Sequence, residues 1–304
     1  MDRVKPGSLK AWLILPRFQF LPLTVILVSL GTAIGAYEGY FHFGHFLLAM
    51  FGSILVHITV NVINDYHDYM DGIDLNTQRT PFSGGSGVLP LNLLKPKQAF
   101  WFGTICILVA MVIGFYFVMV KGWLLFPLLL VAGFSAYFYN VYLSRWLMGE
   151  IFAGLGFGPL LVLGSYYVQT GRYSWETLVA SLAPGILTSN LLFLNEFPDW
   201  EADRKAGRRH FVISLGKKDA SYLFVVFLTA SYVSIIVGVL TKMMPVVTLI
   251  ALGTIGFGWK AAKGALRYYD DSNRLIPVLG ANVITILGTQ ALLAAGYVIA
   301  MLVL

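Results

Sequence analysis

Long apolar stretches alternate along the chain with short polar segments. A helix needs about 20 apolar residues to cross a hydrocarbon core of about 30 Å. By that measure we count nine stretches, and no period-two alternation typical of a membrane barrel accompanies them. The pattern predicts an all-α polytopic membrane protein, a single domain over residues 1–304 with nine transmembrane helices in one bundle. The helices are expected at 16–36, 44–64, 98–119, 123–141, 148–168, 175–195, 219–240, 243–262 and 281–303.

Composition supports this class and excludes others. Hydrophobic residues make up 58% of the 304 residues and charged residues 12%, about half the usual share of a soluble domain. A soluble globular protein and a disordered chain are therefore excluded, and the single Cys106 excludes a disulfide framework. The net charge of +6 comes from basic residues in short segments rather than along one face. We expect a lipid bilayer as partner and no nucleic acid, and the sequence indicates no obligate protein partner.

The basic residues also predict an orientation, because cytoplasmic loops are rich in Lys and Arg. With the N-terminus inside, 18 of the 21 Lys and Arg fall on the cytoplasmic face. Only Lys121, Arg172 and Lys242 fall outside. The two largest loops, 65–97 and 196–218, then share the cytoplasmic face, and the C-terminus lies outside.

Acidic residues gather in those two loops, where residues 64–74 and 195–203 hold eight of the fifteen. Both stretches contain the pattern Asn, acid, aromatic, any residue, Asp. Residues three or four positions apart share a helical face. The side chains of Asp65 and Asp68 are therefore expected to project together, and so are those of Asp199 and Asp203.

Two backbone signals adjoin these acids. Gly72 is expected to end the first motif helix, so that Asp74 returns from the loop. Pro198 is expected to disturb the second motif helix just before Asp199, leaving irregular backbone where a polar cavity can form.

The clustered carboxylates predict a site for a hard cation. Solvated charges at a membrane exit are the alternative, but basic residues would be expected at this face. Oxygen ligands without cysteine favour Mg²⁺ over Zn²⁺, and Mg²⁺ completes its shell with substrate phosphate. Two carboxylate groups that face one cavity suit two Mg²⁺ ions holding a diphosphate. The predicted metal-site residues are Asn64, Asp65, Asp68, Asp74, Asp199 and Asp203, with Asp65, Asp68, Asp199 and Asp203 also predicted to be catalytic.

Several polar residues near the acids are candidates to bind the diphosphate. Arg79 and Arg145 are favoured, because their loops must cover the same face as the carboxylates. Arg17, Lys205, Arg208 and Asn195 are further candidates. Each cation could instead be a plain positive-inside anchor.

A glycine-rich segment, Ser83-Gly84-Gly85-Ser86-Gly87, follows the first motif. It lacks the Gly-Lys-Ser/Thr ending of a P-loop and no strand precedes it. We predict a flexible polar cap over the site. Glycines at 154, 156 and 158 are expected to allow close packing of helices.

The motifs Asn64-Asp65-x-x-Asp68-x5-Asp74 and Asp199-x-x-x-Asp203 resemble those of the UbiA superfamily of intramembrane aromatic prenyltransferases. Their order and the nine-helix layout match too, so the resemblance covers nearly the whole chain. Gly72, two residues before Asp74, makes the chain most similar to the 1,4-dihydroxy-2-naphthoate branch of menaquinone synthesis. One departure is His210, where the second motif commonly ends in Thr.

The resemblance implies a Mg²⁺-dependent transfer of a polyprenyl group from polyprenyl diphosphate to an aromatic acceptor. A bundle of apolar helices would shield the allylic cation from water. Tyr137, Tyr139 and Tyr142 could face that cation through their rings, although aromatic residues near an interface normally form the belt. The family also commonly has a cationic residue at the position of Arg145.

Other functions remain open at this point. The acceptor could be 4-hydroxybenzoate or another lipid precursor. An ion-coupled transporter also uses intramembrane carboxylates, but its acids should lie near the midplane. A CDP-alcohol phosphotransferase needs Ala-Arg where Asp74-Leu75 stands here.

Overall fold

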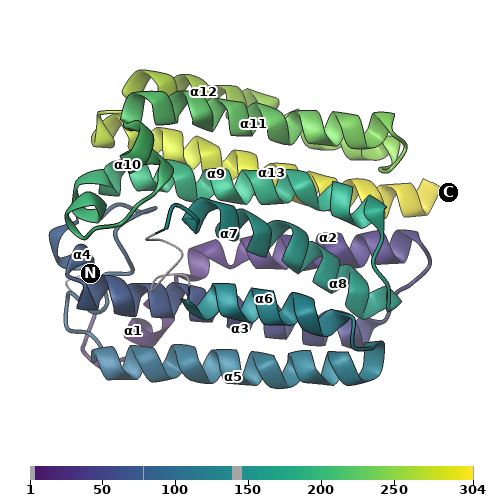
Figure 1. Ribbon diagram of the computed structural model, residues 1–304, viewed down its shortest axis with the longest axis horizontal. Coiled ribbons are helices and arrows are strands. Elements are labelled where there is room, and N and C mark those ends of the chain that lie inside the picture. The colour runs from purple at the N-terminus through teal and green to yellow at the C-terminus, as the bar shows by residue number, and fades with distance from the viewer. Residues whose placement is uncertain (1–3, 78, 139–145, 304) are drawn as a thin grey trace.

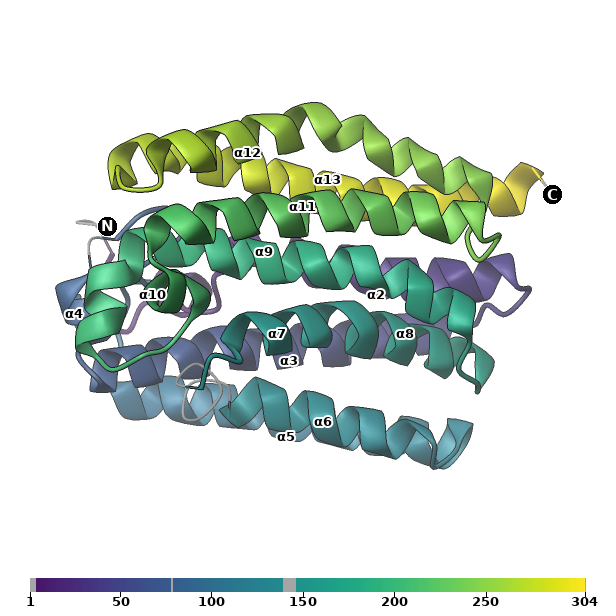
Figure 2. The ribbon, with the colours of Figure 1, turned by 45° about the horizontal axis from the view of Figure 1, so that its top comes forward.

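The structure is a computed structural model that describes residues 4–77, 79–138 and 146–303, and every regular element among them is a helix. The long helices run side by side in one bundle (Figure 1), and a view turned by 45° shows the same arrangement (Figure 2). The predicted all-α class is confirmed. In chain order the elements are α1 (Leu9–Ile14), η1 (Phe18–Phe20), α2 (Pro22–Tyr37), α3 (Phe43–Met70), α4 (Ile73–Asn76), α5 (Pro96–Lys121), α6 (Leu125–Phe138), α7 (Gly149–Leu155), η3 (Gly156–Leu160), α8 (Leu161–Thr170), α9 (Trp175–Lys205), α10 (Phe211–Leu215), α11 (Lys217–Leu240), η4 (Val246–Thr254), α12 (Ile255–Tyr268) and α13 (Ser272–Val303).

Seven helical segments of the described chain are long and apolar enough to cross a membrane. An eighth results if α1 and η1 are joined to α2 across their bend of 51°. The helix α6 is described over 14 residues, which is shorter than a full span. The chain is therefore a polytopic integral membrane protein, and the number of nine spans stays a prediction.

Close packing in the bundle depends on glycine at two of the three positions named from the sequence. A Cβ at Gly158 would overlap the backbone of Gly185, and one at Gly154 would lie 2.8 Å from the Gly185 carbonyl oxygen. The backbones of α7, η3 and α9 therefore touch, as expected for helices that small residues bring together. Gly156 has open space where its Cβ would be, so it does not serve this contact.

The first predicted helix, 16–36, is broken in the structure. Arg17 adopts a left-handed conformation with φ of 53°, and the continuous α2 begins only at Pro22. Tertiary contacts accompany the break, since Asn61 Nδ2 donates to the Pro16 carbonyl at 2.8 Å and the Arg17 guanidinium donates to Asp65. Hydropathy alone does not register such contacts.

The two helices that carry the acidic motifs are longer than predicted. Helix α3 extends from the expected end at 64 to Met70, and α9 extends from 195 to Lys205. Backbone hydrogen bonding does not require apolar side chains, so the helix continues where hydropathy falls. Gly72 follows the end of α3 with φ of 76°, as predicted.

The expectation of irregular backbone at Pro198 is wrong. Helix α9 runs through this proline without a break. A proline removes one backbone donor, and membrane helices tolerate this because neighbouring groups satisfy the freed carbonyl. The carboxylates of α9 thus stand on regular helix.

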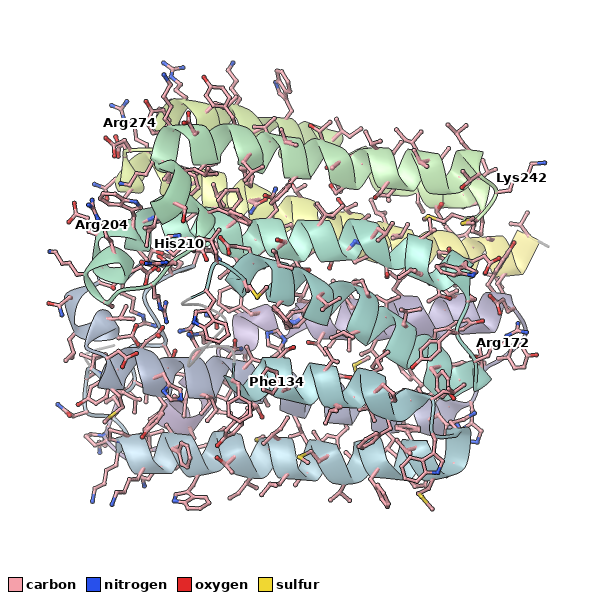
Figure 3. All side chains as sticks on the ribbon, viewed as in Figure 1. Phe134, Arg172, Arg204, His210, Lys242 and Arg274 are labelled. Atoms are coloured by element: carbon pink, nitrogen blue, oxygen red, sulfur yellow. The ribbon has the colours of Figure 1, made fainter. Side chains whose placement is uncertain are left out.

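The loops separate into two ends of the bundle. Figure 3 shows Arg204, His210 and Arg274 at the end where α4 and α10 lie, and Arg172 and Lys242 at the opposite end. This separation matches the two classes of loop that the Lys and Arg count distinguished. We call the end that carries α4 and α10 the motif end.

Candidate active site

A cavity of about 380 Å³ lies within the bundle. Its lining at the motif end is polar and includes Asp68, Asp74, Asp199 and Asp203. Farther into the bundle the lining is apolar, with Phe157, Leu160, Leu128, Phe117 and Val168. The cavity therefore joins a charged mouth to a long apolar interior.

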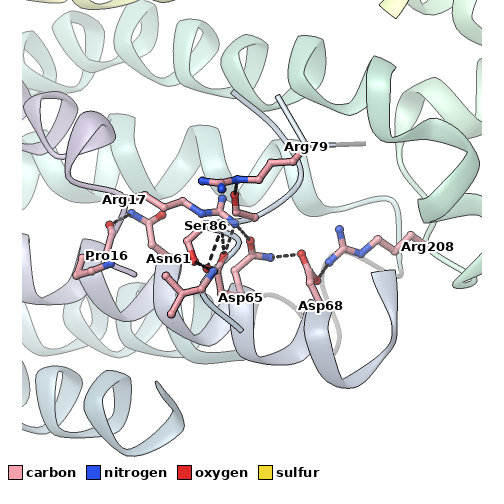
Figure 4. Close-up of polar contacts among 11 residues, drawn as sticks. Pro16, Arg17, Asn61, Asp65, Asp68, Arg79, Ser86 and Arg208 are labelled. Atoms are coloured by element: carbon pink, nitrogen blue, oxygen red, sulfur yellow. Dashed lines mark hydrogen bonds and ion pairs between the residues drawn. The ribbon is translucent and has the colours of Figure 1, made fainter. Parts of the chain in front are cut away.

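The first motif occupies the last turns of α3 (Figure 4). Asn64 donates through Nδ2 to Asp68 at 3.1 Å, and both residues line the cavity. Asp65 lies behind the lining, 1% exposed, where it accepts from Arg17 and from the Ser86 N–H at 3.0 Å. The predicted metal ligand Asp65 is thus already engaged by Arg17 and the glycine-rich loop.

Asp74 enters the cavity from α4, as the loop return predicted. It is 9% exposed, and its Oδ2 is buried without a hydrogen-bond partner among the described residues. Burial, together with the charges of Asp65 and Asp68, raises the pKa of the Asp74 carboxyl to about 7. The Asp74 carboxyl group is therefore available to bind a cation.

The glycine-rich segment, which the sequence predicts to be a cap, lies against the acids of the site. Gly85 has φ of 69°, and a Cβ there would overlap the Asp74 carboxylate. Ser83 and Gly84 line the cavity and lie beside Asp199. The loop therefore contacts acids from both motifs.

The second motif presents one face of α9, because Asn195, Asp199 and Asp203 recur at intervals of four residues. All three line the cavity opposite the first motif. The Oδ1 atoms of Asn195 and Asp199 are buried and have no hydrogen-bond partner in the part of the chain that the structure describes. Buried oxygens without donors, next to several carboxylates, fit a hard divalent cation.

Arginines bind the acids from two sides. Arg17 Nη2 donates to Asp65 and, at 3.4 Å, to Asn64 Oδ1. Arg208 donates through Nη2 to Asp68 and through Nη1 to Asp203 at 3.1 Å, and so joins the two motifs. Arg79 Nε donates to the Gly85 carbonyl at 3.2 Å, within the cap.

Not every predicted site residue reaches the cavity. Lys205 is exposed on the surface at the end of α9. Tyr137 is absent from the cavity lining, and its hydroxyl lies 3.4 Å from the hydroxyl of Thr104 on α5. Arg145, Tyr139 and Tyr142 lie outside the described residues.

Sequence reasoning did not find how part of the polar mouth is assembled. Arg208 follows Asp203 by five residues, but its role depends on Asp68, 140 positions away. Glu150, Glu196 and His210 also form a buried cluster beside the mouth. An ionisable residue in an apolar helix is a signal of function that could have found Glu150.

The chain is similar to known proteins over most of its length. A family model described as the UbiA prenyltransferase family matches residues 24–283. A 2-carboxy-1,4-naphthoquinone phytyltransferase of Synechocystis sp. is 25% identical over 96% of this chain and 94% of that protein. A 1,4-dihydroxy-2-naphthoate octaprenyltransferase of Bacillus subtilis is 26% identical over 75% of this chain and 73% of that protein.

The fold also matches solved structures. A digeranylgeranylglyceryl phosphate synthase superposes with a TM-score of 0.66 at 17% identity, covering 97% of this chain and 99% of that one. A UbiA homolog from Archaeoglobus fulgidus bound to DMAPP and Mg²⁺ gives a TM-score of 0.63 at 15% identity, covering 96% and 99%. None of these matches supports the ion-coupled transporter. The family match spans most of the chain, including both acidic motifs, so the protein belongs to the UbiA prenyltransferase family and is a membrane prenyltransferase.

Proposed function

We propose that the protein transfers a polyprenyl group from polyprenyl diphosphate to 1,4-dihydroxy-2-naphthoate, a step of menaquinone biosynthesis. The observation that carries the proposal is the charged mouth, where acids of α3, α4 and α9 meet at the opening of an apolar interior. A diphosphate suits the mouth and a polyprenyl tail suits the interior. The naphthoate acceptor is supported by the names of the relatives in Synechocystis and Bacillus subtilis.

The mouth would hold the metal between the two motif helices. We assign Asn64, Asp68 and Asp74 to one side, and Asn195, Asp199 and Asp203 to the other, as ligands of two Mg²⁺ ions. Bound Mg²⁺ would neutralise the diphosphate and polarise its bond to the allylic carbon. Asp65, a predicted ligand, acts in this proposal by holding Arg17 and the Ser86 amide in place.

The chain's own cations would bind the leaving group. Arg17 and Arg208 stand at the two sides of the mouth, and Arg79 stands in the cap. Guanidinium groups match phosphate oxygens with two parallel donors and stabilise negative charge that grows as the C–O bond breaks. Arg145 and Lys205 stay candidates on sequence grounds alone.

The apolar interior would protect the reacting carbon. Loss of diphosphate leaves an allylic cation, which water would capture unless the acceptor carbon attacks first. The cap over the mouth and the apolar lining both exclude water from that carbon. We place the motif end on the cytoplasmic side, where the Lys and Arg count puts it.

The direct test is an assay of membranes that contain the protein, with radiolabelled polyprenyl diphosphate and a panel of aromatic acceptors. We expect labelled product with 1,4-dihydroxy-2-naphthoate, none after thorough chelation, and recovery on addition of Mg²⁺. Product with 4-hydroxybenzoate alone would show that the acceptor is 4-hydroxybenzoate and not the naphthoate. Turnover that survives chelation would refute the metal-dependent mechanism.

Substitution of the acids gives a second test of the same proposal. Ala at Asp65, Asp68, Asp199 or Asp203 is expected to lower the rate of transfer at least about a hundredfold. Asp68, Asp199 and Asp203 are proposed metal ligands at the diphosphate, and Asp65 positions Arg17. The matched control is Glu176→Gln, an exposed acid at the other end of α9. Full activity in any of the four, in protein that elutes normally in detergent, would remove that residue from the site.

A further inference from the structure

A second polar cluster lies beside the mouth and is not explained by prenyl transfer. Glu150 at the start of α7, Glu196 on α9 and His210 before α10 place ligand atoms within 4.8 Å of one another. All three are buried, with exposed fractions of 0%, 9% and 4%. Three elements distant in sequence thus bring two carboxylates and an imidazole together inside the protein.

The cluster leaves lone pairs and charge unsatisfied. Glu150 Oε1 accepts the Phe211 N–H at 2.8 Å. Glu150 Oε2 and Glu196 Oε2 are buried without a hydrogen-bond donor among the described residues, and the two carboxyl groups lie within hydrogen-bonding reach of each other. Two adjacent carboxylates repel each other and are costly to bury together. The positive charge of Arg208 is already shared by Asp68 and Asp203.

We propose that Glu150, Glu196 and His210 bind one divalent transition-metal ion, Zn²⁺ or Mn²⁺, at a position in the same cavity next to the proposed Mg²⁺ ligands. Two carboxylate oxygens and an imidazole nitrogen are a donor set that suits these ions. One divalent ion neutralises both glutamates, whereas a shared proton neutralises only one.

The orientation of His210 supports a metal ligand. Its Nδ1 lies 3.5 Å from Glu196 Oε2, and its Nε2 lies 3.4 Å from Asp203 Oδ2. A metal-bound histidine commonly points its other nitrogen at a carboxylate, which fixes the ring. The Ile213 N–H reaches Nδ1 only at 3.4 Å, a long bond that a metal would replace. A loaded cluster would therefore help to orient Asp203 at the mouth.

The test measures metal content and does not depend on turnover. Protein purified in detergent is stripped with a chelator, then equilibrated with Zn²⁺ in excess Mg²⁺, so that the Mg²⁺ ligands are occupied. We expect one Zn²⁺ per chain, and X-ray absorption should show one imidazole nitrogen among its ligands. Glu150→Gln and His210→Asn should each weaken Zn²⁺ binding at least about tenfold, and Glu176→Gln should leave it unchanged.

Two results would overturn the proposal. One is wild-type protein that binds no Zn²⁺ in excess Mg²⁺, which would favour a proton shared by the two glutamates. The other is wild-type affinity in Glu150→Gln or His210→Asn. The X-ray absorption spectrum of the wild-type protein tests for the imidazole ligand even if a variant misfolds. Asp199→Asn separates this site from prenyl transfer, since it should lose transfer and still bind Zn²⁺.

Discussion

At the scale of single residues, the pKa of Asp74 predicts how the metal-free protein responds to pH. Burial raises that pKa from about 3.9 in an unfolded chain to about 7 in the fold. Between these values the folded state holds a proton that the unfolded state has lost, so stability falls as pH rises from about 4 to about 7. Asp74→Asn removes this fall, because the amide stays neutral.

We therefore expect that, in EDTA at pH 8, Asp74→Asn has a higher Tm than the wild type, while at about pH 4 the two are alike. Mg²⁺ should then stabilise the wild type more than the variant. Asp270→Asn is the control, since that side chain is 78% exposed. Parallel Tm curves for wild type and Asp74→Asn across this range would contradict the buried, neutral Asp74.

At the scale of elements, the cap is held close to the metal ligands by a glycine. In Gly85→Ala the new Cβ would overlap the Asp74 carboxylate, and φ of 69° would strain the residue by about 1–2 kcal/mol. The cap should move away from Asp74, and kcat/KM at limiting Mg²⁺ should fall at least about tenfold, with partial recovery at high Mg²⁺.

Gly39→Ala is the matched control for the backbone strain. Gly39 has φ of 88°, but a Cβ there would meet nothing within 4 Å. A loss of stability without loss of activity is expected for this variant. Equal activity in Gly85→Ala and Gly39→Ala would show that close contact between Gly85 and Asp74 is not needed for activity.

At the scale of the whole molecule, the two ends of the bundle predict opposite accessibility across the membrane. The only native cysteine, Cys106, is buried, so a Cys106→Ser background allows single-cysteine probes. Asn273 at the motif end and Thr241 at the opposite end are both exposed. In right-side-out vesicles an impermeant maleimide should label Thr241→Cys at once and Asn273→Cys only after permeabilisation. The reverse pattern would place the motif end outside.

Local patterns in the chain were sufficient for the all-α membrane class and for the positions of the acids. Apolar runs reflect transfer into lipid, and a spacing of three or four residues places side chains on one helical face. Both patterns can be recognised within a segment of about 20 residues. Asp199 and Asp203, four residues apart on α9, both line the cavity because of this spacing, whereas Asp65, three residues before Asp68, does not. Helix α3 continues past its expected end at 64 to Met70, because backbone hydrogen bonding does not require apolar side chains.

Packing between helices decided which groups meet. Asp65 is held by Arg17, 48 positions earlier, and Asp68 by Arg208, 140 positions later. Glu150 meets Glu196 and His210 only because glycines let α7 and η3 lie against α9. The predicted ligand Asp65 turned away from the cavity, and Lys205 and Tyr137 never reached it. Contacts between distant segments depend on crossing geometry and close approach of whole helices, and no local spacing encodes them.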